Sequence, residues 1–146
     1  MTAPAATLAG RTVVITGAAR GVGRAIAEAC AAQGAKLILC DILDEAGRQT
    51  TAELVAAGAP ARFVAIDLAD PASIEAFAAN IRANEGTIHG LVNNAAVTNS
   101  GGKGFDELAI DEWDRVMRVN VRGTWLVIRA LVPLFPAGDG RIVNLA

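Results

Sequence analysis

Short runs of aliphatic and β-branched residues alternate along this chain with longer segments that suit helices. The apolar runs lie at about 12–16, 36–40, 62–66, 89–92 and 141–145. Their length and continuity are typical of buried parallel strands. Between and after these runs, helices are predicted at about 21–33, 44–57, 70–86 and 111–132. This alternation predicts an α/β fold, an open parallel sheet with helices on both faces.

The first predicted strand runs into a glycine-rich turn, TGAARGVG, at residues 16–23. Gly17 lets the chain turn sharply, Gly21 lets the backbone approach a pyrophosphate, and Gly23 lets the next helix pack closely. The N-terminus of that helix directs free N–H groups and a partial positive charge at the phosphates. The spacing is G-x-x-x-G-x-G, and the Gly-Lys-Ser/Thr ending of ATP- and GTP-binding P-loops is missing. We therefore predict a dinucleotide site here, with a turn that binds no ligand as the alternative.

Polar residues follow the other predicted strands. Asp41 ends the second strand, 24 positions after Gly17, while Asp67 and Asn94 follow the third and fourth strands. The carboxyl ends of parallel strands meet at one edge of the sheet, where open α/β sheets bind ligands. A carboxylate at the position of Asp41 suits the hydroxyls of an adenosine ribose. The alternative is that Asp41 caps the helix that follows it.

Two residues lower the intrinsic stability of the long helix predicted at 111–132. Gly123 costs about 1 kcal/mol relative to Ala, and Asn120 is also unfavourable in a helix. Gly123 would allow another segment to pack closely against the helix. Asn120 would place an amide where polar groups or water must be met. A solvated surface position is the alternative for Asn120.

Composition limits the function classes. The chain has 146 residues, of which 53% are hydrophobic and 19% charged, which suits one globular domain. The net charge is −2 and no basic patch is visible, so no nucleic-acid partner is expected. Without a signal peptide or a bilayer-length apolar run, a cytoplasmic protein with no membrane contact is expected. Cys30, Cys40 and His89 lack the spacing of metal ligands, so no metal site is predicted and His89 is expected to be structural.

At these motifs the sequence resembles the short-chain dehydrogenase/reductase family. The matching segments are Thr16-Gly17-Ala18-Ala19-Arg20-Gly21-Val22-Gly23, Asp67-Leu68, Asn93-Asn94-Ala95-Ala96 and Asn120-Val121-x-Gly123. The resemblance covers essentially the whole chain from about residue 8. It implies a Rossmann-type doubly wound parallel sheet with strands in the order 3-2-1-4-5. It also implies an NAD(P)-dependent oxidoreductase that transfers hydride between nicotinamide and a carbonyl or alcohol substrate.

The resemblance further implies a role for each motif. The glycine-rich turn at residues 16–23 would hold the pyrophosphate, Asp67-Leu68 would border the adenine, and the segment at residues 94–96 would lie along the cofactor. The cofactor-binding residues are then Gly17, Ala19, Arg20, Gly21, Val22, Gly23, Asp41, Asp67, Leu68, Asn94, Ala95 and Ala96. Asn93 would brace the sheet, and Ala96 stands where the family more often has Gly. Asn120 matches the catalytic asparagine that helps to hold a proton-relay water.

The resemblance also implies a catalytic Ser, Tyr and Lys after the fifth strand. None can be assigned here, because the chain has no Tyr and its lysines, Lys36 and Lys103, lie upstream. We therefore expect residues 1–9 to form an N-terminal arm and residues 10–146 to form the front of a dinucleotide-binding domain that is truncated here. The family's later strands would lie beyond residue 146, and the 146 residues alone are expected to be inactive.

The cofactor is expected to be NAD rather than NADP. The charge of Asp41 would repel a 2′-phosphate at close range, whereas Arg20 could attract one. The expected substrate is a small alcohol or ketone, and the full-length protein is expected to be a homo-oligomer, a dimer or tetramer. Two alternatives stay open. One is a non-catalytic NAD-binding Rossmann module, and the other is a methyltransferase, which the Asn93–Ala96 stretch and the wide glycine spacing disfavour.

Overall fold

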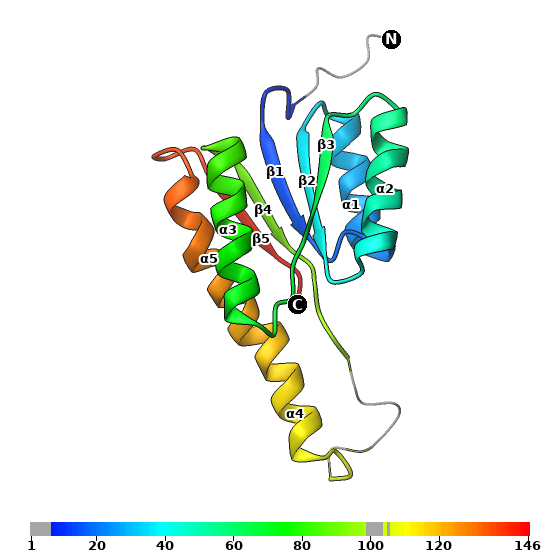
Figure 1. The fold of residues 1–146 in the computed structure, drawn as a ribbon, viewed down its shortest axis with the longest axis vertical. Coiled ribbons are helices and arrows are strands. Elements are labelled where there is room, and N and C mark those ends of the chain that lie inside the picture. The colour runs from blue at the N-terminus through cyan, green and yellow to red at the C-terminus, as the bar shows by residue number, and fades with distance from the viewer. Residues whose placement is uncertain (1–6, 99–103, 105) are drawn as a thin grey trace.

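The computed structural model describes residues 7–98, 104 and 106–146 of the protein. Within them lies one parallel sheet of five strands in the order β3-β2-β1-β4-β5 (Figure 1). The strands are β1 (Thr12–Thr16), β2 (Lys36–Asp41), β3 (Ala61–Ala65), β4 (Gly90–Asn93) and β5 (Arg141–Asn144). The predicted order is therefore confirmed. The order reverses between β1 and β4, which places a switch point at the carboxyl ends of these two strands.

Helices cover both faces of the sheet. The helices α1 (Gly21–Ala32) and α2 (Asp44–Ala56) lie on one face, and α3 (Pro71–Glu85) lies on the other (Figure 1). Successive side chains of a strand point to opposite faces. Accordingly, Val13 and Ile15 of β1 belong to the core beneath α1 and α2, whereas Val14 belongs to the core beneath α3. Both faces of the central strands are thus buried, which explains their continuous apolar runs.

The long helix predicted at 111–132 begins at Ile110 and changes its winding along its length. It consists of α4 (Ile110–Val116), a π-helical segment η1 (Met117–Gly123), α5 (Thr124–Leu131) and a short 3-10 turn η2 (Val132–Leu134). Figure 1 shows these segments as one continuous rod, with α4 projecting beyond the carboxyl ends of the strands. π-Helical segments are rare and frequently lie at functional sites. The segment η1 contains both residues that weaken the predicted helix, Asn120 and Gly123.

Most other predicted bounds differ from the observed ones by one residue. Asn93 belongs to β4, and its Nδ2 donates to Oδ1 of Asn144 at 2.8 Å, so an amide pair joins the ends of β4 and β5. At the opposite end of the sheet, Nδ1 of His89 accepts from the backbone N–H of Thr12 at 3.1 Å, which supports a structural role for His89. Leu8 donates from its backbone N–H to the Gln33 carbonyl at 3.0 Å. Leu8 is therefore held against the end of α1.

A buried carboxylate ties α3 to the sheet. The Glu85 side chain is 4% exposed and accepts from Nζ of Lys36 at 2.6 Å and from Nε of Arg62 at 2.8 Å. Burial acts to raise the pKa of the Glu85 carboxyl, but the hydrogen bonds from Lys36 and Arg62 outweigh it and lower this pKa below its usual range. Lys36 begins β2 and Arg62 lies in β3. The cluster therefore fastens three elements at the end of the sheet away from Asp41.

We expect Glu85→Gln to lower the free energy of unfolding at pH 7 by about 2 kcal/mol, because it leaves two cations without their carboxylate. The folded-state pKa lies below the unfolded one, so this stabilisation is present above the unfolded pKa and is lost as the pH falls through the folded pKa. Urea unfolding should therefore show a smaller difference between variant and parent at about pH 3.5 than at pH 7. Glu75→Gln, at an exposed position of α3, is the control. A difference that stays constant with pH would contradict the electrostatic origin.

Candidate functional site

The turn after β1 requires glycine at three positions, because of a positive φ at Gly17 and Gly21 and because of close neighbours at Gly17 and Gly23. Gly17 has a φ of +66° and Gly21 a φ of +57°, a region that favours glycine. A Cβ added to Gly17 would lie 2.8 Å from Cα of Ala95, and one added to Gly23 would collide with the Gly17 carbonyl oxygen. The turn, the start of α1 and the segment after β4 are therefore in direct backbone contact. This is the close packing that the sequence predicts for Gly23.

Asn94 fastens the turn to the end of β4. Its Nδ2 donates to the carbonyl oxygens of Thr16 and Gly17, each at 3.0 Å. In return, Oγ1 of Thr16 accepts from the backbone N–H groups of Asn94 at 3.1 Å and Ala95 at 3.0 Å. These four bonds fix how the chain leaves β1 and β4 at the switch point of the sheet.

Asp41 holds the turn from the side of β2. Its Oδ2 accepts from the backbone N–H of Ala19 at 3.0 Å, and its Oδ1 accepts from the N–H of Leu43 at 3.0 Å. The N-cap of α2 is Leu43, so the alternative that Asp41 caps this helix was wrong. Asp41 is the last residue of β2. Thr50, which no motif marks, donates from its buried hydroxyl to the Ala19 carbonyl at 2.8 Å.

The loop after β3 is held by η1. Oδ1 of Asp67 accepts from the N–H of Ala69 at 2.8 Å, and a guanidinium nitrogen of Arg122 donates to the Ala69 carbonyl at 2.9 Å. A Cβ added to Gly123 would lie 2.5 Å from the Leu68 carbonyl oxygen. The predicted close packing at Gly123 is therefore confirmed, and its partner is this loop.

The amide of Asn120 pairs with the segment after β4. Its Oδ1 accepts from the N–H of Val97 at 2.8 Å, and its Nδ2 donates to the Val97 carbonyl at 2.9 Å. The alternative of a solvated surface residue was wrong. In this conformation the amide braces the chain beyond Ala96, and its part in holding a relay water stays a prediction.

These segments surround a cavity of about 510 Å³ beyond the carboxyl ends of the strands. The predicted site residues that line it follow the strands β1, β2, β3 and β4. They are Gly17, Arg20, Gly21, Asp41, Asp67, Leu68, Asn94, Ala95 and Ala96. The other four predicted residues do not line it. Ala19 and Gly23 are buried in the packing of the turn, Val22 is exposed on α1, and Asn120 faces Val97. Their proposed roles in binding or catalysis are not tested by this placement.

Sequence reasoning missed several lining residues. Most of them directly follow or precede a predicted motif, and they are Ile42, Leu43, Ile66, Ala69 and Val97. Arg115 and Val119 come from the long helix. They are four residues apart, the spacing at which neighbours share a helix face. No predicted motif marks this face, although Val119 directly precedes Asn120. No group of three or more His, Cys, Asp or Glu in the described ranges could hold a metal ion, and no helix within them is long and apolar enough to cross a bilayer.

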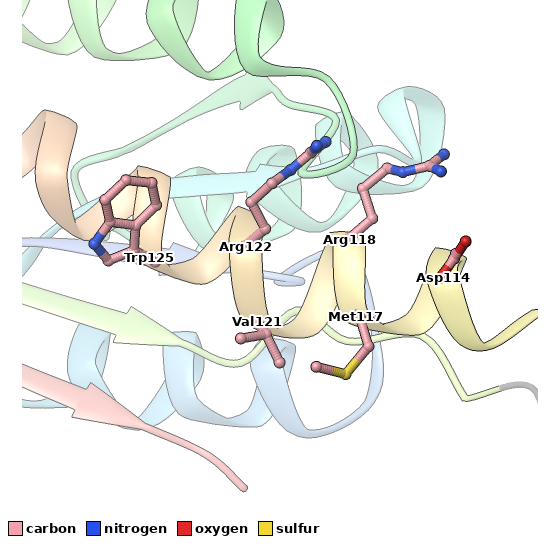
Figure 2. Close-up of a pocket in the computed structure, with 6 residues that line it drawn as sticks. All are labelled: Asp114, Met117, Arg118, Val121, Arg122 and Trp125. Carbon is pink, nitrogen blue, oxygen red and sulfur yellow. The ribbon is translucent and has the colours of Figure 1, made fainter.

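A second hollow lies on the outer side of the long helix, and Figure 2 shows the residues that line it. Met117 and Val121 point to one side of the helix, whereas Arg118 and Arg122 point to the other (Figure 2). Trp125 is 55% exposed and Val121 is 54% exposed. Apolar side chains of this size at a surface commonly mark a site of interaction.

The arrangement of cavity, turn and strand ends agrees with comparisons to known proteins. The model of the short chain dehydrogenase family matches residues 11–146. The chain belongs to the short-chain dehydrogenase family. A relative from Mycobacterium tuberculosis, named 3-alpha-(or 20-beta)-hydroxysteroid dehydrogenase, is 40% identical over 140 residues, which are 95% of this chain and 52% of that protein. Sorbitol dehydrogenase of Cereibacter sphaeroides is 40% identical over 95% of this chain and 53% of its own length.

Solved structures of the same family superpose closely. A short-chain dehydrogenase/reductase from Burkholderia phymatum in complex with NAD has a TM-score of 0.85 and 36% identity, over 94% of this chain and 49% of that one. A metagenomic short-chain oxidoreductase in complex with NADP has a TM-score of 0.87 and 38% identity, over 95% of this chain and 64% of that one. The chain thus spans about half the length of the curated relatives it matches. One of these two structures holds NAD and the other NADP, which supports a nicotinamide cofactor.

Proposed function

We propose that this chain is the dinucleotide-binding part of an NAD(P)-dependent oxidoreductase, which transfers hydride between nicotinamide and the carbonyl or alcohol carbon of a small molecule. The cavity at the switch point carries this proposal, because it joins a glycine turn, a carboxylate after β2 and a polar loop after β3. Relatives named as dehydrogenases and a relative bound to NAD support it.

In this proposal each strand end takes one part of the nucleotide. The pyrophosphate lies over the turn from Gly17 to Gly21, where the N-terminus of α1 offers N–H groups and a partial positive charge. The carboxylate of Asp41 accepts hydrogen bonds from the adenosine ribose. The adenine lies by Asp67 and Leu68, and the nicotinamide half lies toward Asn94, Ala95 and Ala96. Ala19, Val22 and Gly23 act by shaping the turn and the start of α1.

The cofactor supplies the hydride chemistry when it is bound. This part of the chain would position the cofactor, since Asn94 and Asn120 fix the segment along which the nicotinamide half would lie. The proton has to be moved by a tuned acid, and the family resemblance implies a Ser, Tyr and Lys that these 146 residues do not contain. We propose that these residues belong to a longer protein, that the 146 residues alone are inactive, and that the enzyme is cytoplasmic.

A hydride-transfer assay of the full-length protein tests this function. Oxidation of NADH or NADPH by a panel of small ketones, followed by the loss of nicotinamide absorbance, is the expected result. Binding of the cofactor without turnover would favour the non-catalytic Rossmann module. Binding of S-adenosylmethionine in place of either nicotinamide cofactor would overturn the proposal in favour of a methyltransferase.

We expect the full-length protein to bind NADH at least about tenfold more tightly than NADPH, because a 2′-phosphate would meet the charge of Asp41. Arg20 also lines the cavity and could attract that phosphate, so the balance has to be measured. Asp41→Asn should bring the NADH and NADPH affinities closer together, since it removes the charge. Its amide oxygen can still accept from the Ala19 N–H, whereas the bond from the Leu43 N–H is lost. Asp44→Asn, at an exposed position of α2, should leave the ratio unchanged. Tighter binding of NADPH by the parent protein would reverse the assignment of NAD.

We also propose that the full-length protein forms a homo-oligomer through the outer side of the long helix. The hollow lined by Met117, Val121 and Trp125 supports this, because it presents apolar groups beside the charges of Asp114, Arg118 and Arg122 (Figure 2). Light scattering on the purified full-length protein tests it, with a dimer or tetramer expected. A monomer at micromolar concentration would contradict the proposal.

A further inference from the structure

The N–H and the carbonyl of Ala19 are each held by a side chain from another element. The N–H of Ala19 donates to Asp41, and its carbonyl accepts from the hydroxyl of Thr50 at 2.8 Å. Ala19 is 3% exposed and Thr50 is 2% exposed. Thr50 lies within α2 and does not line the cavity. The buried hydroxyl of Thr50 in α2 thus holds the glycine turn through a hydrogen bond to the backbone of Ala19.

This bond determines the direction of the next N–H group. In a trans peptide unit the C=O and the N–H point in opposite directions. Because the Ala19 carbonyl points toward α2, the N–H of Arg20 on the same peptide unit points away from α2. That N–H has no protein acceptor within the described part of the chain. Arg20 lines the cavity and is the N-cap of α1, with extended φ and ψ of −159° and 177°.

We propose that Thr50 is a positioning residue of the nucleotide site. Its hydroxyl holds the Ala19 carbonyl toward α2, so that the N–H of Arg20 is directed at a phosphate of the bound nucleotide. This inference rests on the proposed function, because it requires a phosphate-containing ligand in the cavity. Asp41 supports the same arrangement by holding the preceding peptide unit through the Ala19 N–H.

The next residue in the chain is a matched control. Thr51 is 8% exposed, and its hydroxyl also donates to a backbone carbonyl at 2.8 Å. Its acceptor is Gly47, one turn earlier in α2, and Thr51 makes no bond to the turn. Thr→Val at position 50 or 51 therefore removes the same kind of buried hydroxyl from the same helix. Only the change at position 50 frees the Ala19 carbonyl.

The test is calorimetric titration of the full-length protein and its variants with ADP-ribose, together with a thermal unfolding curve for each. We expect Thr50→Val to weaken ADP-ribose binding by about tenfold, the scale of one lost hydrogen bond to a charged group. Thr51→Val should stay within about twofold of the parent, and Thr50→Ser should restore binding, since only the hydroxyl is required. If Thr50→Val does not fold, Thr50→Ala removes the hydroxyl with less bulk and is measured in its place.

Titration with adenosine, which has no phosphates, distinguishes two effects of Thr50→Val. One is a misplaced Arg20 N–H that no longer meets a phosphate, and the other is a general disturbance of the nucleotide site. Adenosine binding should change little in Thr50→Val. Parental ADP-ribose affinity in Thr50→Val, equal losses in Thr50→Val and Thr51→Val, or an equal loss for adenosine would each overturn the role of Thr50. Those outcomes leave the proposed function intact as long as the parent binds ADP-ribose. A parent that binds neither ADP-ribose nor a nicotinamide cofactor overturns both.

Discussion

Gly23→Ala is expected to weaken NADH binding by the full-length protein at least about a hundredfold, because backbone atoms already occupy the space that its methyl group needs. The added Cβ would collide with the Gly17 carbonyl oxygen and would lie 2.5 Å from Nδ2 of Asn94. Neither neighbour can rotate away, since Asn94 is held by its bonds to the Thr16 and Gly17 carbonyls. The start of α1 must therefore move off β1 and carry the pyrophosphate turn with it.

Gly58→Ala is the control for this experiment. Gly58 follows α2, has a φ of +91°, and has nothing within 4 Å of an added Cβ. Its substitution costs backbone strain of about 1–2 kcal/mol without touching the cavity, so NADH affinity should stay at the parental value. Calorimetry gives the affinity and urea unfolding gives the stability of each variant. If Gly23→Ala binds NADH within about threefold of the parent, the close backbone contact is not needed for binding.

The sequence predicted the parts of the fold that depend on local pattern. Apolar runs such as Val13–Ile15 identify buried strands, because both faces of a central parallel strand lie in the core. The sharp turn predicted at Gly17 and the close packing predicted at Gly23 are confirmed, because only glycine fits this backbone approach. The strand order came with the family resemblance and was confirmed by the observed pairing of β1 with both β2 and β4.

The missed features depend on contacts between elements. Thr50 and Arg122 act by side-chain bonds to the backbone of loops that lie 31 and 53 residues away in sequence. Nothing in the neighbouring sequence distinguishes Thr50 from Thr51, because the difference arises only when α2 packs beside the turn. Asp41 illustrates the same limit. An acid shortly before a helix is a common cap signal, but the pairing of Asp41 with Ala65 makes it the last residue of β2, and the N-cap of α2 is Leu43.

The winding of η1 was also beyond the sequence pattern. Asn120 and Gly123 both weaken a helix, but the sequence pattern predicts a single helix through both and not the π-helical segment that contains them. The structure gives each of them a tertiary partner, Val97 for Asn120 and Leu68 for Gly123. Two loops of the cavity, one after β3 and one after β4, are thus fastened to the same helical segment. A shift of η1 should therefore move both loops and weaken the contacts proposed at both ends of the nucleotide.

Gly123→Ala is the substitution that tests this. A Cβ at position 123 would lie 2.5 Å from the Leu68 carbonyl oxygen and 2.8 Å from Cβ of Leu68, so η1 and the loop must separate. We expect the free energy of unfolding to fall by about 2 kcal/mol, within the range for overpacking a buried contact. ADP-ribose affinity should fall about tenfold as well, because Leu68 lines the cavity. Urea unfolding and calorimetric titration of the full-length protein measure the two effects.

The sign of the stability change makes this test decisive. Helix propensity alone predicts that Gly→Ala within a helix stabilises the protein by about 1 kcal/mol, the opposite of the effect expected from the contact with Leu68. Arg122→Ala removes only the bond to the Ala69 carbonyl and should give a smaller loss of affinity. Arg82→Ala changes an exposed arginine of α3 that lines neither hollow and should alter neither measurement. A more stable Gly123→Ala protein with parental ADP-ribose affinity would mean that η1 does not set the position of the loop after β3.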